Sequence, residues 1–122
     1  MALRALADGA LFAETFGDAP PRILALHGWG RRGSDFGPSL AGFDALALDL
    51  PGFGASPPPS QPIGAEGYAA LISPILDMFE APPVVVGHSF GGRVAVCLAA
   101  AHPGLVGPLV LTGSPLLRVT PA

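Results

Sequence analysis

Four short apolar runs, each ending in a glycine or proline turn, constrain the fold of this 122-residue chain more than any other feature. They are RILALHG at 22–28, FDALALDLPG at 43–52, PVVVGHS at 83–89 and GPLVLTGSP at 107–115. Continuous apolar strands with helical segments between them are typical of a parallel sheet that is covered on both faces. The pattern therefore predicts an α/β fold with a mostly parallel sheet and helices on both faces.

The segments between these runs show helical spacing or turn composition. Apolar side chains recur at helical intervals over 65–80 and predict a helix, which Pro74 is expected to kink or delay. Residues 91–102 are typical of a nearly all-apolar helix, and 34–43 of a short one. Ahead of the runs, LRAL and LFAETFG flank the turn ADGA and predict an antiparallel hairpin at one edge, which gives about six strands. The proline-rich stretch 54–64 is expected to be a loop.

Composition limits the size of the domain and the kind of partner. A chain of this length buries one moderate core, so we expect a single domain over residues 1–122. Half of the residues are hydrophobic and 12% are charged, which excludes a disordered chain and predicts that a partner covers part of the surface. Six arginines against nine acidic residues, with no lysine and no basic run, argue against a nucleic-acid ligand.

The sequence also argues against export and against membrane association. Cys97 is the only cysteine, and Asp8 and Gly9 interrupt the N-terminal apolar residues before a signal-peptide core is reached. The stretch 94–117 carries no Arg, Asp or Glu, but the HPG turn at 102–104 divides it into a helix and a strand. We therefore expect a cytoplasmic protein.

The sequence GHSFGG at 87–92 joins a predicted strand directly to a predicted helix. Gly87, Ser89 and Gly91 match G-x-S-x-G, a pattern in which a sharp turn places the serine hydroxyl clear of the sheet. The positive end of the following helix stabilises negative charge that develops near the serine. Ser89 is therefore the candidate nucleophile, and a glycine-rich turn with an incidental serine is the alternative.

Several segments in order resemble the α/β-hydrolase superfamily. LALHGWG at 24–30 is similar to the family's oxyanion loop, LDLPGFGAS at 48–56 to the segment after its fourth strand, and VVVGHSFGG at 84–92 to its nucleophile elbow. The GHSxGG form is closest in style to the esterase, lactonase and peptidase branch. The resemblance implies the strand order 1-2-4-3-5-6 and covers only the N-terminal half of the family's fold, without the cap and the C-terminal strands.

The resemblance makes Ser89 the nucleophile and places the backbone N–H groups of Trp29 and Phe90 in an oxyanion hole. Two such donors, aimed at the oxyanion of a tetrahedral intermediate, are worth roughly 3 to 4 kcal/mol each. The Trp29 ring either lines an acyl pocket or packs over the site, and both interpretations stay open. No metal or organic cofactor is expected, because the sequence has no ligand cluster and no dinucleotide-type glycine loop.

The three histidines are possible surrogate bases for Ser89, and each has a structural alternative. In the resembling family the histidine at the position of His27 usually holds the oxyanion loop by hydrogen bonds. His88 adjoins the nucleophile, but successive side chains leave a tight turn in different directions. His102 lies at the end of the predicted helix, where it is expected to act as a cap. Asp49 is expected to tie neighbouring loops together through backbone N–H groups.

The acid and the histidine of the family follow the serine, beyond the sixth strand. In this chain no Asp or Glu follows Glu80, and the only histidine after Ser89 is His102. We therefore expect weak, serine-dependent hydrolysis of small activated esters or related acyl substrates. The alternatives are a noncatalytic remnant that acts as a binding or assembly module, and one half of a pair that a second polypeptide completes.

A sheet that stops at the sixth strand exposes PLVLTG at 108–113 as a hydrophobic edge. Such a surface favours self-association, so we expect a homodimer or a larger assembly, formed through sheet edges or by exchange of elements. An assembly of this kind also brings a histidine of one chain close to Ser89 of another.

Overall fold

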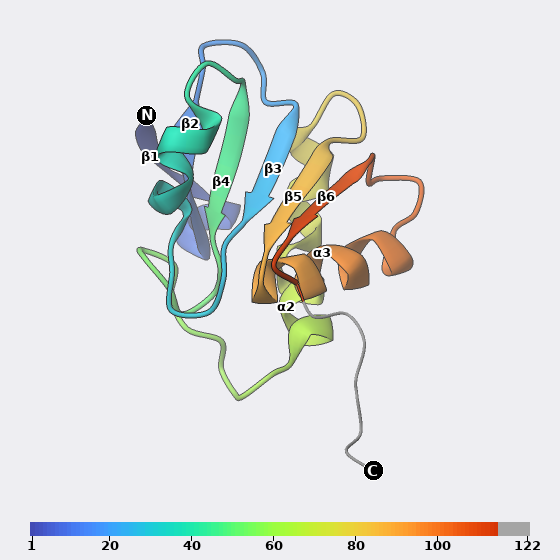
Figure 1. Ribbon diagram of the computed structural model, residues 1–122. Helices are drawn as coiled ribbons and strands as arrows, with labels where there is room; N and C mark the ends of the chain where they lie inside the picture. Colours follow the sequence, from blue (N-terminus) through green and yellow to red (C-terminus); the bar gives the residue numbers. More distant parts are fainter. Residues whose placement is uncertain (115–122) are drawn as a thin grey trace.

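The computed structural model describes residues 1–114 and contains one mixed sheet of six strands (Figure 1). The strands are β1 (Ala2–Leu6), β2 (Leu11–Phe16), β3 (Ile23–Leu26), β4 (Ala45–Asp49), β5 (Val84–His88) and β6 (Leu109–Thr112). Their order across the sheet is β1-β2-β4-β3-β5-β6, which confirms the predicted α/β fold and strand order. Pro115, the last residue of the fourth apolar run, lies outside the described residues.

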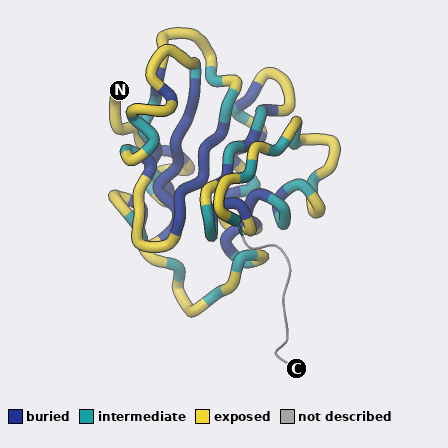
Figure 2. Tube along the Cα trace, in the orientation of Figure 1, coloured by how far each residue is buried: buried dark blue, intermediate teal, exposed yellow. Residues whose placement is uncertain are grey.

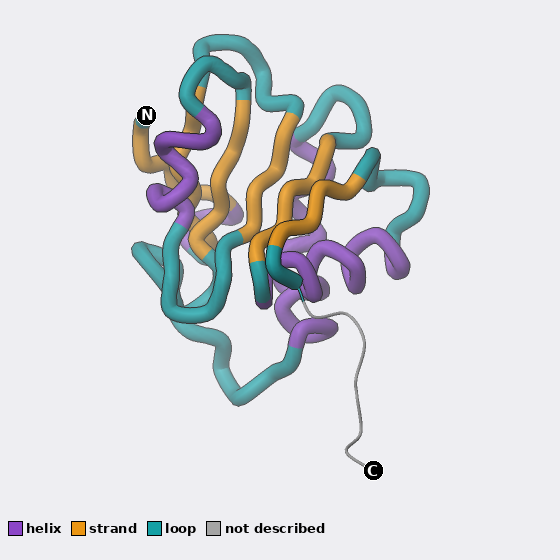
Figure 3. Tube along the Cα trace, viewed as in Figure 1, coloured by secondary structure: helices purple, strands orange, loops and turns teal. Residues whose placement is uncertain are grey.

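Short helices join most consecutive strands of the described segment, and a loop joins β2 to β3 (Figure 3). The α-helices are α1 (Gly37–Leu40), α2 (Ala65–Ile72) and α3 (Phe90–Ala101), and the 3₁₀ helices are η1 (Ala7–Gly9), η2 (Gly33–Phe36) and η3 (Ser73–Met78). The helix expected over 65–80 is divided, because Pro74 has no N–H for an α-helical bond and the chain continues from Ile72 as a 3₁₀ helix.

Parallel pairing brings the carboxyl ends of β3, β4, β5 and β6 to one edge of the sheet. β3 lies between β4 and β5 and is parallel to both, and β6 is parallel to β5. β1 and β2 form the expected antiparallel hairpin, and β2 joins β4 in antiparallel pairing. The loops that follow β3, β4 and β5 therefore meet at the same edge, where open α/β sheets place their ligand sites.

Side chains alternate between the two faces of the sheet and form two separate cores. The central strands β3 and β4 are buried along most of their length (Figure 2). The larger core includes Leu26, Leu48 and Leu98 and is covered by α2 and α3. The smaller core includes Ala25 and Leu40 and is covered by η2 and α1. Helices thus cover both faces, as the continuous apolar runs predict, and every residue of β4 is buried.

The start of α3 lies directly against the sheet. A Cβ atom at Gly91 would overlap the carbonyl oxygens of Leu26 and His27, at the end of β3. A Cβ atom at Gly87 would overlap the backbone of Gly92, one turn into the helix. These glycines let α3 follow β5 at once, so the residues between strand and helix form a tight turn.

We expect Gly91→Ala to lower the free energy of unfolding by about 1 to 3 kcal/mol, because its methyl group overlaps backbone atoms that have little freedom to move. Gly104→Ala is the matched control, since no atom lies within 4 Å of its Cβ position. Urea unfolding of both variants beside the wild type measures the difference. Equal stability of the two variants would contradict the close approach of α3 to β3.

Candidate active site at the carboxyl edge of the sheet

Ser89 forms the turn between β5 and α3. Its φ of 52° and ψ of −118° lie outside the regions that residues with a side chain favour, so the turn is strained. Its N–H donates a hydrogen bond of 2.8 Å to the carbonyl of Thr112 in β6. The side chain is half-buried, and its hydroxyl forms no hydrogen bond with a residue in the described part of the chain.

Two backbone N–H groups beside Ser89 have no acceptor within residues 1–114. Phe90 is the first residue of α3, so its N–H has no helical partner one turn earlier. Trp29 lies in the loop after β3, and the carbonyl of Gly28 before it accepts from the Arg31 N–H at 3.1 Å. The Cβ position of Gly28 lies 3.4 Å from the Ser89 Cβ, so this loop passes directly beside the serine.

Four aromatic rings pack edge to face beside the elbow. The Trp29 ring centroid lies 4.9 Å from that of Phe53, 5.3 Å from that of Phe90 and 6.2 Å from that of Tyr68. Tyr68 and Phe90 also pack on one another, at 5.4 Å. Trp29 remains 63% exposed, so its ring packs on its neighbours and still presents an apolar surface to solvent.

His27 is buried, and both of its ring nitrogens are bonded to backbone groups. Nε2 accepts a hydrogen bond of 2.9 Å from the Leu50 N–H, so the proton is on Nδ1, which donates to the Gly28 carbonyl at 2.7 Å. Burial lowers the pKa of His27, and the Gly28 carbonyl and Asp49 only partly oppose this effect. His27 is therefore a neutral link between the loop after β3 and the loop after β4.

Asp49 ties the same two loops together from the end of β4. Its Oδ1 accepts a hydrogen bond of 2.7 Å from the Gly33 N–H, and its Oδ2 accepts one of 3.0 Å from the Ala55 N–H. The Ser56 hydroxyl donates to the Asp49 carbonyl at 2.6 Å and accepts from the Phe12 N–H at 2.9 Å. These contacts match the structural role that the sequence predicts for Asp49.

His88 and His102 occupy different ends of the strand-helix unit. The Nδ1 atom of His88 shares a hydrogen bond of 2.9 Å with the Thr112 hydroxyl, on an exposed part of the edge. His102 is the C-terminal cap residue of α3, a helix of 12 residues and roughly 18 Å in length, so it lies far from Ser89 of the same chain. Within residues 1–114, no histidine nitrogen lies within hydrogen-bond distance of the Ser89 hydroxyl.

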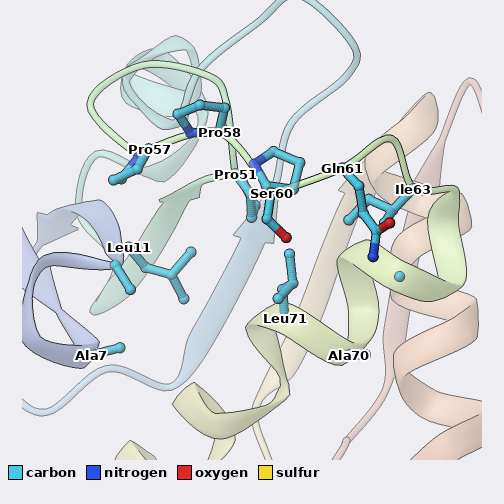
Figure 4. Close-up of a pocket in the computed structure, with 13 residues that line it drawn as sticks. Ala7, Leu11, Pro51, Pro57, Pro58, Ser60, Gln61, Ile63, Ala70 and Leu71 are labelled. Carbon is cyan, nitrogen blue, oxygen red and sulfur yellow. The ribbon is translucent and has the colours of Figure 1, made fainter.

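Two hollows lie near the loops that follow β3 and β4. One, of about 340 Å³, adjoins Gly28 and is lined by polar side chains that include Arg31, Asp35, His88 and Thr112. The other, of about 400 Å³, is mostly apolar and lies between the β1–β2 turn, the proline-rich loop and α2 (Figure 4). None of the candidate catalytic residues lines this second hollow.

In the part of the chain that the structure describes, no group of three or more His, Cys, Asp or Glu side chains is placed to hold a metal ion. None of the described helices has the length and apolar character needed to cross a membrane. Cys97 is half-buried in α3, and desolvation raises the pKa of its thiol, which makes it a poor nucleophile.

Sequence patterns do not single out three residues that pack on the loop of Trp29 or bond the elbow: Phe53, Tyr68 and Thr112. The helical spacing of Tyr68 indicates only a core position, and Phe53 lies in a loop. A signal for Thr112 is present, because a polar residue ends or follows each parallel strand, as His27, Asp49 and His88 do. Such residues meet at one edge of a parallel sheet.

The neutral state of His27 predicts a pH-dependent stability. The pKa of His27 is below 6.5 in the folded chain and near 6.5 in the unfolded chain. As the pH falls from about 6.5 through the folded-state pKa, only the unfolded chain gains the proton, so the free energy of unfolding decreases; above 6.5 the contribution is fully present.

Urea unfolding at pH 7.5 and 5.5 measures this difference. His27→Gln is expected to be less stable at pH 7.5 and to lose this part of the pH dependence, whereas His102→Gln removes a histidine outside the loop network and serves as the control. An unchanged pH dependence in His27→Gln would refute the assignment.

Comparison with known proteins identifies a family and several relatives that this chain resembles. Residues 21–122 match the model of the α/β hydrolase fold family. A pimeloyl-[acyl-carrier protein] methyl ester esterase of Neisseria meningitidis serogroup C is 38% identical over 109 residues, which are 86% of this chain and 41% of the relative. The esterase Rv0045c of Mycobacterium tuberculosis is 36% identical over 107 residues, or 84% of this chain and 36% of the relative.

Solved structures of an esterase and a lactonase also superpose on this chain. The crystal structure of Rv0045c superposes with a TM-score of 0.80 at 35% identity and covers 90% of this chain and 41% of that one. The N-acyl homoserine lactonase AidH, in complex with N-butanoyl homoserine, superposes with a TM-score of 0.82 at 26% identity. The match covers 94% of this chain and 46% of the lactonase chain. The chain spans less than half the length of these relatives, and it belongs to the α/β hydrolase fold family.

Proposed function

We propose that this chain carries the nucleophile and the oxyanion hole of a serine hydrolase that acts on carboxylic esters. The observation that supports this most is the position of Ser89, in a strained turn directly before Phe90 and beside the loop that carries Trp29, since the N–H groups of both residues have no acceptor in the described residues. Preorganised donors of this kind stabilise charge that develops in a transition state, because they need no rearrangement during the reaction.

In the proposed reaction the Ser89 hydroxyl oxygen attacks the ester carbonyl carbon, and the hydroxyl proton passes to a base. The carbonyl oxygen becomes an oxyanion that accepts hydrogen bonds from the N–H groups of Trp29 and Phe90. Collapse of the tetrahedral intermediate breaks the ester C–O bond and releases the alcohol, which takes up a proton. Water then hydrolyses the acyl-enzyme and regenerates the Ser89 hydroxyl.

In the described residues no histidine forms a hydrogen bond with the Ser89 hydroxyl, so the same chain supplies no base in contact with it. We assign His27 to holding the oxyanion loop, since both of its ring nitrogens already have partners, and His102 to the end of α3. His88 lies nearest to Ser89 in sequence. Without a base in reach, rates of serine hydrolases fall by about four to six orders of magnitude, so activity is expected on esters with acidic leaving groups.

The relatives and the aromatic cluster support a proposal for the substrate class. Two relatives are named as esterases and one as a lactonase, and esters and lactones share the acyl–oxygen bond that Ser89 would attack. The exposed Trp29 ring and its neighbours Phe53 and Phe90 offer an apolar surface beside the serine. We therefore propose esters with small apolar acyl groups as substrates. The cytoplasmic location stays a prediction.

The two alternatives remain distinct in their consequences. A noncatalytic binding or assembly module would hydrolyse no ester in a Ser89-dependent way. A half that a second polypeptide completes, with its own acid and histidine, would be active only after mixing of the two chains. The same ester-hydrolysis assay tests both alternatives, with the purified chain alone and with the chain mixed with a second polypeptide that carries the acid and the histidine.

Hydrolysis of p-nitrophenyl acetate and p-nitrophenyl butyrate tests the nucleophile. Ser89→Ala is expected to lower the rate at least about tenfold, to that of a protein with an oxyanion hole and no nucleophile. Ser60→Ala, an exposed serine of the proline-rich loop, is the matched control and keeps the wild-type rate. Equal rates in the wild type and Ser89→Ala would make this chain noncatalytic toward these esters.

Self-association is proposed through β6, an edge strand of the described sheet. Leu109 and Leu111 pack on the larger core, whereas Val110 points to the opposite face and is 47% exposed. An apolar edge strand with free backbone groups is a template for pairing with a second chain.

Light scattering at micromolar concentration is expected to show a dimer or larger species. Val110→Lys places a charge on this edge and is expected to yield the monomer. Leu3→Lys, on the opposite edge strand β1, is the matched control, because Leu3 is similarly exposed. A monomeric wild type, or dissociation by Leu3→Lys alone, would reject β6 as the interface.

A further inference from the structure

Thr112, the last residue of β6, contacts the elbow in two ways. Its backbone carbonyl accepts the 2.8 Å hydrogen bond from the Ser89 N–H. Its hydroxyl shares the 2.9 Å hydrogen bond with Nδ1 of His88, the residue before the nucleophile. One residue of a neighbouring strand therefore holds two consecutive residues of the turn, one through its backbone and one through its side chain.

The His88 ring fills the space between the oxyanion loop and the end of β6. Its Cδ2 atom lies 3.6 Å from the Cβ position of Gly28, and its Cε1 atom lies 3.4 Å from that of Gly113. The Ser89 Cβ lies 3.4 Å from the same position at Gly28. The His88 ring thus lies beside both the loop that carries Trp29 and the residue that follows β6.

A strained backbone conformation such as that of Ser89 persists only where surrounding contacts fix it. On the helix side, the close contacts of Gly87 and Gly91 supply this constraint. On the strand side, the described contacts come from Thr112.

We propose that Thr112 is a positioning residue of the elbow: its hydroxyl fixes the His88 ring, and through this ring it holds Ser89 against the oxyanion loop. The catalytic part of this inference rests on the proposed function, because Thr112 acts on the reaction only through Ser89. Its structural part concerns the local opening of the turn and is measurable without any substrate.

Thr112→Val tests the hydroxyl, since valine keeps the β-branched shape and the backbone carbonyl. Thr112→Ser is the conservative partner, because it restores the hydroxyl. The first readout is amide hydrogen exchange at Ser89 by NMR, with amides in β3 and β4 as internal references. The second is the Ser89-dependent rate on p-nitrophenyl butyrate.

Thr112→Val is expected to raise the exchange rate of the Ser89 amide about fivefold, the effect of one lost hydrogen bond, and to lower the ester rate by a similar factor. Thr112→Ser is expected to restore both to within about twofold. An unchanged Ser89 amide, or an equal rise at all reference amides, would overturn the inference. A faster amide with an unchanged ester rate would also overturn the positioning role.

A second pair of variants tests the same contact from the other side. Asparagine places an amide near the position of His88 Nδ1, so His88→Asn is expected to keep the slow exchange of the Ser89 amide, whereas His88→Leu is expected to lose it. If no Ser89-dependent hydrolysis exists, the proposed function fails, and the exchange measurements on both pairs still decide the inference.

Discussion

The close approach of α3 to the carboxyl ends of β3 and β5 is the constraint on which the other features of the site depend. Gly91 lies against the carbonyl oxygens of Leu26 and His27, and Gly87 lies against Gly92. Only Ser89 therefore separates the end of β5 from the start of α3. The turn must therefore be made by Ser89 itself, in a conformation that residues with side chains avoid. The same geometry puts the N–H of Phe90, which has no helical acceptor, directly beside the serine.

The start of α3 provides only the Phe90 N–H group beside Ser89. The position of the Trp29 N–H group depends on polar residues at the ends of the neighbouring strands. His27 bonds the loop after β3 to Leu50, and Asp49 bonds Gly33 to Ala55. Two of these hydrogen bonds, from Leu50 to His27 and from Gly33 to Asp49, are buried, and a hydrogen bond is stronger in a poorly solvated site than in water. The loop that carries Trp29 is thus held in place by side chains at the carboxyl ends of β3 and β4.

The sequence predicts the frame of this site much better than its details. The continuous apolar runs place the four parallel strands, and the turn ADGA places the hairpin, because both signals depend on local backbone preference and burial. Pro74 correctly marks the end of α-helical bonding in α2. The packing of Phe53 and Tyr68 on Trp29, and the bond between Thr112 and His88, join residues far apart in the chain. No local pattern encodes such contacts, since they depend on the register of the strands.

The position of β6 couples the edge of the sheet to the chemistry of the elbow. Among the described residues β6 pairs with β5 alone, and on that side its last residue, Thr112, holds Ser89 and His88. An edge strand with one partner opens more readily than a central strand, because fewer hydrogen bonds must break. A second strand that paired with β6 would reduce this opening and keep Thr112 in place. Association at this edge and positioning of Ser89, the proposed nucleophile, would then favour one another, as linkage requires when both depend on the same ordered strand.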